Sequence, residues 1–309
     1  MNKWAHIAGI AFSIIFGFSF MFSKILLNQV SPMGVIAYRF LVAFLFFELL
    51  RRAKIIKINA RFNKFLPILI VGVFQPVAYF IFETYGLNKT TSAEAGLMIA
   101  LIPIFVTIFS AFILKEKPKI LQVLFILVSF IGVVIIQLFK PNINFQADLL
   151  GFIFLLLAVL SAAAFNIASR IASKTSKPQE TTYFMMFLGM ITFNMIYLTQ
   201  LTVKQELNLY FNNLMNLDVI LPTLYLGVIA SILGFFLVNY SLSKLPAHVS
   251  SIYSNIATIV SVMAGFFFLN EAIEIYHLIG GVLIILGIYG TTRVNYLIKR
   301  KRLKYDQTH

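Results

Sequence analysis

Ten runs of mostly apolar residues, each about 20 residues long, follow one another along this chain of 309 residues. A helix that crosses a bilayer needs about 20 such residues, because its backbone polar groups have no water to bond and must pair within the helix. The connections between the runs are short. We therefore predict an all-α integral membrane protein with ten transmembrane helices, at about residues 5–27, 33–50, 65–87, 91–114, 120–139, 149–172, 181–202, 219–241, 246–269 and 276–297.

The composition excludes several other classes of protein. Only 12% of the residues are charged, against about 25% in soluble domains, and the mean hydropathy is +0.90. There is no cysteine, so disulfides and thiol chemistry are excluded. The net charge of +14 lies in short runs between apolar segments, which indicates orientation in a membrane and not a nucleic-acid partner. The first apolar run is too long for a signal peptide, and we expect it to be retained.

The basic residues predict the orientation. If the N-terminus lies inside, 20 of the 25 Lys and Arg residues lie on the inner side, four on the outer side, and Arg39 within the second helix. Short cytoplasmic loops carry the excess of Lys and Arg in membrane proteins. The distribution therefore predicts that both termini are cytoplasmic and that the protein spans the cell membrane several times.

A stretch in the first half of the chain recurs in the second half. Residues 69–132 match residues 224–287 at eleven of 64 ungapped positions, and the matches include Lys89 with Lys244 and Glu116 with Glu271. We expect two related halves, residues 1–140 and 147–297, followed by a basic cytoplasmic tail at 298–309. Since five helices is an odd number, the second half would be inverted, as in alternating-access transporters. The alternative is a duplication that serves only packing.

Small and polar residues share one face in several of the predicted helices. Such faces do not suit lipid, and some of these side chains would lie near the middle of the membrane. We predict that they line a substrate path consisting of Gln75, Tyr79, Glu83, Pro103, Thr107, Asn255 and Thr258. The alternative is close helix packing, for which small residues spaced by four are the usual device, or hydrogen bonding between helices.

Charged groups within the predicted helices indicate possible gates. A carboxylate such as Glu83 costs several kcal/mol inside a membrane unless it is paired, protonated or in contact with water. The candidates for an outer gate are Lys24, Arg39 and Glu94, and those for an inner gate are Asn166, Arg170 and His248. The alternatives are a structural ion pair, or side chains that extend to the membrane interface. For Glu116 and Glu271 we expect interfacial caps of helix ends.

Several segments resemble the EamA-type members of the drug/metabolite transporter superfamily. FGFSFMFSK (16–24) is similar to the opening segment of the family, Tyr38-Arg39-Phe40 to its Phe-Arg pair, and residues 101–103 and 114–116 to its Leu-x-Pro and Leu-x-Glu pattern. Residues 269–271, Gly280-Gly281 and Gly287 fit the second half, whereas Thr258 replaces a proline and Met185 an arginine. The resemblance implies ten helices and a central cavity lined mainly by helices 1, 3, 4, 6, 8 and 9. It also implies transport of amino acids or other small metabolites, often outward, with no catalytic residues.

The sequence thus predicts a secondary active transporter for a small polar or amphipathic metabolite. No ATP-binding motif is present, so a gradient would supply the energy, and protons are a candidate coupling ion. We expect membrane lipids as neighbours, no metal and no cofactor, and the sequence leaves monomer and homodimer open. One alternative is a non-transporting scaffold or receptor, for which such short loops offer little surface. The other is a membrane-embedded enzyme, which would need clustered His, Asp or Glu residues, but the four histidines are scattered.

Overall fold

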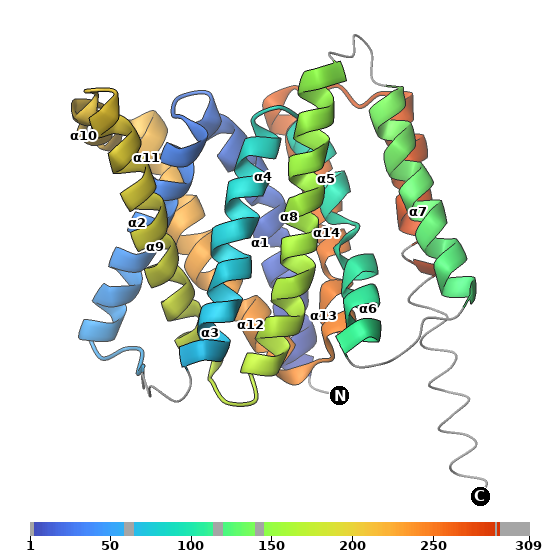
Figure 1. Cartoon of the computed structure of the whole chain (residues 1–309), viewed down its shortest axis with the longest axis horizontal. Coiled ribbons are helices and arrows are strands. Elements are labelled where there is room, and N and C mark those ends of the chain that lie inside the picture. Colours follow the sequence, from blue (N-terminus) through green and yellow to red (C-terminus); the bar gives the residue numbers. More distant parts are fainter. Residues whose placement is uncertain (1–2, 59–64, 114–119, 140–144, 288, 291–309) are drawn as a thin grey trace, which may run out of the picture.

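The computed structural model describes residues 3–58, 65–113, 120–139, 145–287 and 289–290 (Figure 1). The described residues form helices and no strand. The predicted tail at 298–309 and the predicted cap Glu116 lie outside them.

The helices follow the predicted apolar runs, with breaks inside some of them. Those of the first half are α1 (Lys3–Leu27), α2 (Pro32–Arg52), α3 (Phe65–Gly72), η2 (Val73–Ala78), α4 (Tyr79–Leu87), α5 (Ser92–Ile99), α6 (Ile102–Ile113) and α7 (Ile120–Leu138). Those of the second half are α8 (Phe145–Ala172), α9 (Pro178–Val203), α10 (Leu207–Met215), α11 (Leu217–Leu224), η3 (Tyr225–Gly234), α12 (Phe235–Lys244), α13 (Ala247–Ser251), α14 (Ser254–Leu269) and a last helix, Ile275–Gly287.

Within the described residues, eight helical stretches are long and apolar enough to cross a membrane. They are Lys3–Leu27, Pro32–Arg52, Leu66–Leu87, Ser92–Ile113, Leu149–Ala172, Pro178–Val203, Leu217–Lys244 and Ala247–Leu269. The fifth and tenth predicted spans correspond to two shorter apolar helices, Val123–Ile136 and Ile275–Gly287. The prediction of an all-helical membrane protein is therefore confirmed, with eight spans supported by length and composition.

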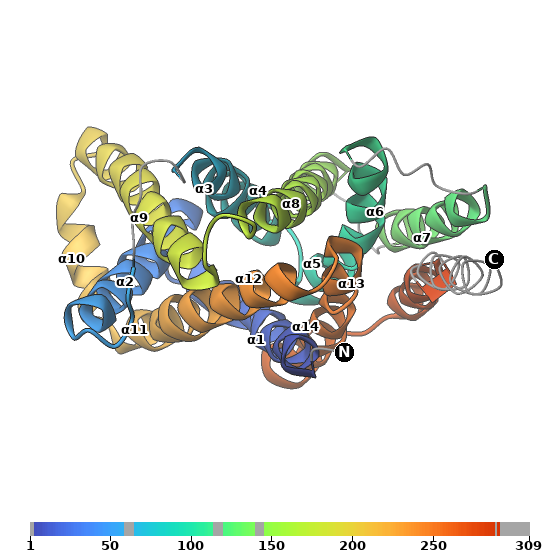
Figure 2. The ribbon, with the colours of Figure 1, turned by 90° about the horizontal axis from the view of Figure 1, so that it is seen from below.

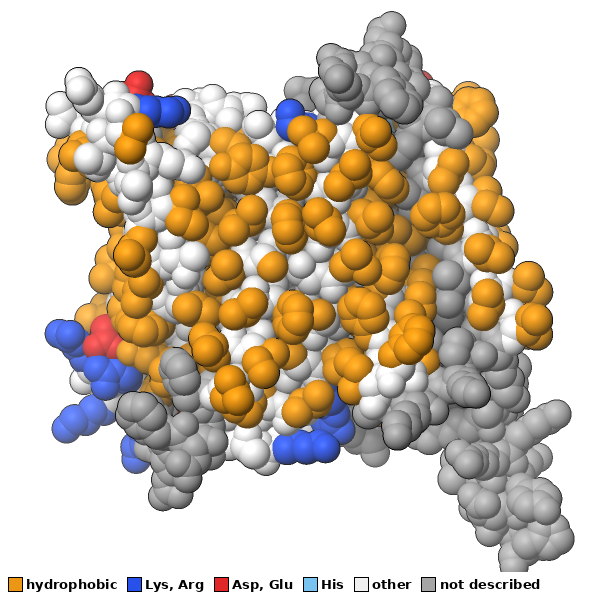
Figure 3. All heavy atoms as spheres, in the orientation of Figure 1, with side chains coloured by type: hydrophobic (Ala, Val, Ile, Leu, Met, Phe, Trp, Pro, Cys, Tyr) orange, Lys and Arg blue, Asp and Glu red, His pale blue; other side chains and the backbone are white. Residues whose placement is uncertain are grey.

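The outer surface has the character of a lipid-facing belt. Large apolar side chains are exposed on many helices; Leu45 on α2 and Met195 on α9 are 55% and 65% exposed. Figure 3 shows hydrophobic side chains across the middle of the face, with Lys and Arg at its upper and lower edges and more of them at the lower edge. Exposed apolar surface of this extent is unusual in soluble proteins and marks contact with lipid.

The third apolar helix of each half is irregular at matching positions. In η2, Gln75 has an extended backbone (φ −151°, ψ 114°) and interrupts the helix. The repeat offset of 155 residues maps η2 onto 228–233, which lie within the π-helical segment η3. The fourth helices are also broken, at residues 100–101 between α5 and α6 and at 252–253 between α13 and α14. The third helices thus share an irregular segment at matching positions, whereas the breaks in the fourth helices do not match, because the offset maps 100–101 onto 255–256 within α14.

The first helix of each half packs mainly against helices of the other half. α1 contacts α14, η3 and α12 of the second half, while α8 contacts α4, η2 and α6 of the first half (Figure 2). α2 packs against α9, its counterpart. α7 and the last helix lie side by side at one edge, where a Cβ on Gly132 would meet the carbonyl oxygen of Gly280 at 2.5 Å.

The short helix α10 was not predicted from the sequence. It occupies the connection between α9 and α11 and is held by two tyrosines: Tyr38 Oη donates to the carbonyl of Tyr210 (3.0 Å), and Tyr210 Oη donates to Asn194 Oδ1 (2.6 Å). Leu209 and Phe211 on the same helix are 43% and 62% exposed. An amphipathic helix of this kind suits the membrane interface.

Glycines let α1 approach α14 closely. A Cβ on Gly9 would lie 2.4 Å from the Tyr253 ring, and one on Gly17 would lie 2.5 Å from Val260 Cβ and 2.8 Å from the carbonyl oxygen of Ala257. This part of the small-residue face of α1 therefore serves helix packing, which was the alternative interpretation of these faces.

We expect the replacement Gly17→Ala to destabilise the protein. The added methyl group overlaps a backbone oxygen that cannot move away alone, and overpacking of this kind costs about 1–3 kcal/mol. Thermal unfolding of the purified protein should show a lower Tm. The matched control is Gly281→Ala, where the new Cβ meets only Leu97 Cδ2 at 3.4 Å. Equal Tm values for the two variants would contradict a tight α1–α14 contact.

Candidate functional site

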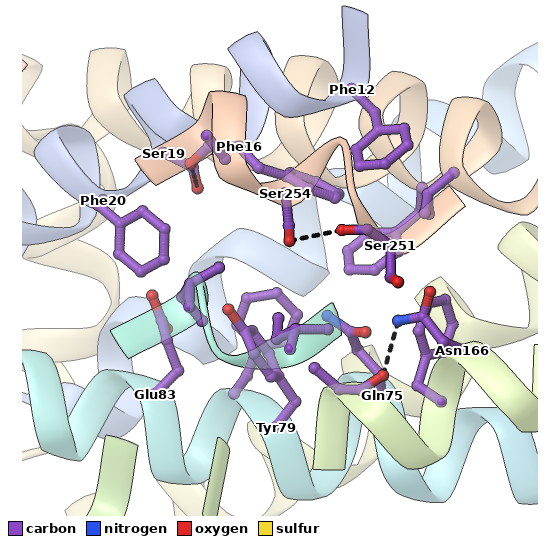
Figure 4. Close-up of a pocket in the computed structure, with 18 of the residues that line it drawn as sticks. Phe12, Phe16, Ser19, Phe20, Gln75, Tyr79, Glu83, Asn166, Ser251 and Ser254 are labelled. Atoms are coloured by element: carbon purple, nitrogen blue, oxygen red, sulfur yellow. Dashed lines mark hydrogen bonds between the residues drawn. The ribbon is translucent and has the colours of Figure 1, made fainter. Parts of the chain in front are cut away.

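A cavity of about 70 Å³ lies between the two halves (Figure 4). Its aromatic lining consists of Phe12, Phe16, Phe20, Tyr79, Phe80, Phe165 and Phe235. Its polar lining consists of Ser19, Arg39, Gln75, Glu83, Asn166, Ser251 and Ser254. The remaining lining residues are Ile99, Ile102, Ala162, Val238 and Ala257. The cavity therefore combines an aromatic wall with one acidic, one basic and several neutral polar groups.

Glu83 supplies the negative charge of the cavity. It is 2% exposed, and its Oε2 accepts a hydrogen bond from Thr84 Oγ1 at 3.0 Å. No cation among the described residues lies within 4.0 Å of its carboxylate. In Figure 4 the carboxylate points from α4 toward the space below Ser19 and Phe20. The structure thus gives Glu83 no close ion-pair partner to offset the cost of burying a charge.

The positive charge comes from Arg39 on α2, which is also 2% exposed. Its Nε donates to Ser231 Oγ on η3 at 2.8 Å, and its guanidinium carbon lies 4.3 Å from the centroid of the Phe80 ring. A guanidinium over an aromatic face is attracted by the ring electrons, more strongly when water is excluded. Arg39 therefore links α2, η3 and α4 at the wall of the cavity.

Three neutral polar side chains complete the part of the site that the sequence singled out. Tyr79 and Glu83 share one face of α4, since residues four apart lie on the same side of a helix, and Gln75 lines the same cavity from the irregular segment η2. Asn166 reaches the cavity from α8, with its Nδ2 donating to the carbonyl of Ala162 at 2.8 Å. The structure thus brings together five of the predicted site residues.

The other residues of the predicted path lie outside the cavity lining. Thr258 Oγ1 donates to the carbonyl of Gly96 at 2.8 Å and joins α14 to α5. Thr107 Oγ1 donates to the carbonyl of Pro103 within α6, also at 2.8 Å. Asn255 Oδ1 is buried without a hydrogen-bond partner among the described residues. A path through these positions stays a prediction.

Two of the predicted gate residues form equivalent contacts at the ends of helices. Lys24, near the end of α1, donates from Nζ to the carbonyls of Leu87 (2.9 Å) and Thr90, at the end of α4. Arg170, near the end of α8, donates from Nη1 to the carbonyls of Leu242 (2.8 Å) and Ser243 (3.0 Å), at the end of α12. Leu87 and Leu242 are repeat equivalents, 155 residues apart. We call these contacts the Lys24 clasp and the Arg170 clasp; in each, a cation stabilises a helix C-terminus.

The remaining gate candidates lie at helix starts. Glu94 forms a capping box with Thr91 at the start of α5, with hydrogen bonds of 3.1 Å in both directions, and its Oε1 lies 4.0 Å from His277 Nε2. His248 lies in α13, where its carbonyl accepts a hydrogen bond from Ser251 Oγ at 3.1 Å. Neither side chain lines the cavity.

Glu271 caps α5, a helix of the opposite half. Its carboxylate accepts hydrogen bonds from Ser92 N (2.8 Å), Ser92 Oγ (2.9 Å) and Ala93 N (3.0 Å). These amides are among the helix-terminal N–H groups that have no partner within the helix, and a negative charge there is favourable. The prediction that Glu271 caps a helix end is confirmed; its position at the membrane interface stays a prediction.

Most of the aromatic wall, Ser19 and Ser254 were not identified from the sequence. Phe12, Phe16 and Phe20 recur every four residues on α1, and this spacing could have identified them. Ser254 was missed because α13 and α14 are separated by a break, which shifts the face that a continuous helix would present. Among the described residues, no three His, Cys, Asp or Glu side chains gather in a way that could hold a metal ion.

A bundle of membrane-crossing helices around a polar and aromatic cavity defines a multi-pass integral membrane protein of the transporter class. The chain belongs to the EamA-like transporter family, which matches residues 3–138 and 149–293. The two matched segments support a duplicated chain. Membership in a family of transporters also excludes the enzyme alternative.

Relatives match over nearly the full length. The uncharacterized transporter YcxC of Bacillus subtilis (strain 168) is 36% identical, over 96% of this chain and 95% of that protein. An uncharacterized transporter of Archaeoglobus fulgidus is 28% identical, over 95% and 99%. A crystal structure of another protein superposes with a TM-score of 0.66 and 16% identity, over 96% of this chain and 99% of that one; it supports the fold alone.

We expect the substitution Arg39→Lys to lower the Tm by several degrees. Lysine cannot form the flat contact with Phe80 while donating from the position of Nε to Ser231, and a desolvated cation–π contact is worth about 2 kcal/mol. Thermal unfolding of the purified protein measures the change. The matched control is Arg51→Lys at an exposed position, for which little change is expected. Identical stability of Arg39→Lys and the wild-type protein would contradict this role.

Proposed function

We propose that this chain is a secondary active transporter that moves a small metabolite with polar and apolar parts across the cell membrane by alternating access. The proposed substrate is an amino acid or a related compound, and the proposed direction of transport is outward. Ten transmembrane helices would form two inverted halves, with both termini in the cytoplasm, and protons are the proposed coupling ion.

The observation that carries this proposal is the buried carboxylate of Glu83 in a cavity lined by both halves. Without a cation within 4.0 Å among the described residues, the carboxylate can change partner between a proton and a cationic group of a substrate. Arg39 on the same cavity suits an anionic group, and the aromatic wall suits an apolar part. An amphipathic metabolite satisfies all three kinds of lining.

The inverted arrangement is supported by helix directions and charges. In Figure 1, α1 starts at the lower edge, near the marked N-terminus, whereas α8 ends at that edge. The lower edge also carries more of the Lys and Arg side chains in Figure 3. Under the positive-inside rule this edge is cytoplasmic, which agrees with the orientation expected from the sequence.

The two clasps support a gating role for Lys24 and Arg170. They tie α1 to α4 and α8 to α12, so each lies at the opposite end of the bundle from the other. We assign the Lys24 clasp to the outer side and the Arg170 clasp to the inner side. Alternating access requires these ends to open in turn, and each clasp would have to break before the helices that it joins can separate.

We expect Glu83→Gln to abolish uptake driven by a proton gradient while exchange of substrate persists, with a higher KM because the carboxylate no longer pairs with a cationic group of the substrate. Glutamine keeps the shape of the side chain but cannot bind and release a proton. The measurement uses proteoliposomes and a panel of the proteinogenic amino acids, with substrates first ranked by a metabolite screen of cells with and without the protein.

The control for this experiment is Glu48→Gln. Glu48 is a carboxylate on α2 that pairs with Arg51 and Arg52 and does not line the cavity, so its replacement should leave coupling unchanged. A Glu83→Gln protein whose uptake keeps the wild-type dependence on pH would contradict a proton-carrying role for Glu83.

We also expect each clasp to control access from one side only. Ser254 lines the cavity, and the chain has no cysteine, so Ser254→Cys gives a single reactive thiol. Adding Lys24→Met should speed labelling by a membrane-impermeant maleimide from the outside, and adding Arg170→Met should speed it from the inside. A lost hydrogen bond to a charged group, about 1.5–3 kcal/mol, corresponds to about tenfold or more.

The matched controls are Lys204→Met and Lys174→Met, which remove exposed lysines at the two ends of the bundle. Both should leave the labelling rates unchanged. Equal acceleration from both sides in the clasp variants would indicate general loosening and would contradict gating.

A further inference from the structure

A second, larger cavity of about 560 Å³ forms a groove between α2 and the η3–α12 segment. Phe46, Phe47 and Leu50 form one wall, and residues 228–236 supply the other. Ten of the twelve lining residues are apolar. Phe46 and Leu233, on opposite walls, are 42% and 43% exposed, so the groove opens on the surface. Its volume lies within the range of about 300–1,000 Å³ that is typical of small-molecule sites.

The groove is closed at one end by the chain that follows α2. Lys54 has a positive φ of 59°, which turns the backbone, and the amides of Ile55 and Ile56 bond to the carbonyl of Leu50 at 3.1 and 3.4 Å. This turn places Ile55, Ile56 and Lys57 in the lining. Gln179, in the first turn of α9, is the other polar lining residue.

The charge at this end is positive. Arg51 and Arg52 share the carboxylate of Glu48, at 2.6 and 2.8 Å, whereas no described acidic side chain lies within 4.0 Å of Lys57. Lys57 is exposed, and so is Lys177 two residues before Gln179. The groove is therefore apolar along its walls and cationic at its closed end.

We propose that this groove is a binding site for an anionic phospholipid of the inner leaflet. One acyl chain lies between α2 and η3, and the phosphate group is held by Lys57, with the amide of Gln179 donating to it. Basic side chains at the cytoplasmic ends of membrane helices attract anionic headgroups. The site goes beyond the proposed transport activity and does not share a lining residue with the central cavity.

The position of the groove connects it to the central cavity. Ile232 lines the groove, and the adjacent Ser231 accepts the hydrogen bond from Arg39. A Cβ on Gly227 would meet Val42 Cγ1 at 2.8 Å, so α2 and η3 are in close contact next to the groove. A bound acyl chain would therefore support the contact between α2 and η3 from the lipid side.

The test measures thermal unfolding of the purified full chain in detergent micelles with added palmitoyl-oleoyl phosphatidylglycerol or phosphatidylcholine. We expect phosphatidylglycerol to raise the Tm by about 2–4 °C more than phosphatidylcholine. Lys57→Gln should raise the phosphatidylglycerol concentration for half-maximal stabilisation about fivefold, because one lysine near an anionic headgroup contributes on that scale. Ile229→Trp, which fills the groove with an apolar side chain, should abolish the selective effect.

Two matched controls separate this site from general lipid effects. Lys174→Gln removes an exposed lysine that does not line the groove, and Ile259→Trp places the same bulky residue on α14, at a position 51% exposed. Both should respond as the wild type does. The proposal is overturned if the two lipids stabilise equally, or if Lys57→Gln and Ile229→Trp respond like their controls. A dimer that dissociates only in Ile229→Trp would instead assign the groove to a second copy of the chain and would also overturn it.

Discussion

The bilayer requires every backbone polar group within it to find a partner, and this constraint determines where the chain can depart from a regular helix. Irregular backbone is tolerated at membrane depth only where it is buried in protein or faces a cavity. All three breaks lie at the central cavity. Gln75 itself lines the cavity, and so do Ile102 and Ser254, which directly follow the breaks at 100–101 and 252–253. The helix breaks are therefore found where the central cavity is, because there the backbone groups that they free do not face lipid.

The ends of the helices impose a second requirement, since their last carbonyls and first amides also need partners. Here long charged side chains from neighbouring segments supply them: Lys24 of α1 and Arg170 of α8 at two C-termini, and Glu271, just after α14, at the N-terminus of α5. Each contact stabilises a helix end and at the same time joins separate helices. A motion that separates those helices must break hydrogen bonds to charged groups, which are stronger than those between neutral groups.

The features that could be predicted from the sequence are those that depend on the length, hydropathy and residue spacing of single segments. Length and hydropathy located the spans, and spacing by four residues placed Gln75, Tyr79 and Glu83 on one face. What the sequence could not supply was the rotation of each helix about its axis and the depth of each break. The break at 252–253 shifted the lining face of the fourth helix of the second half from the predicted Asn255 and Thr258 to Ser254 and Ala257. Arg39 and Asn166 were assigned to gates from their depth alone, and only tertiary packing placed them at the cavity.

The repeat makes the asymmetry of the cavity informative. Phe80 and Phe235 are repeat equivalents, both line the cavity, and their ring centroids lie 6.0 Å apart, so the aromatic frame is shared by the two halves. Glu83 and Val238 are also equivalents on the lining, but one is acidic and the other apolar. A symmetric scaffold would accept a substrate in two orientations. The single carboxylate on the described lining removes that equivalence, so in the proposed transporter a substrate with one charged end and one apolar end would be held in one orientation relative to the two halves.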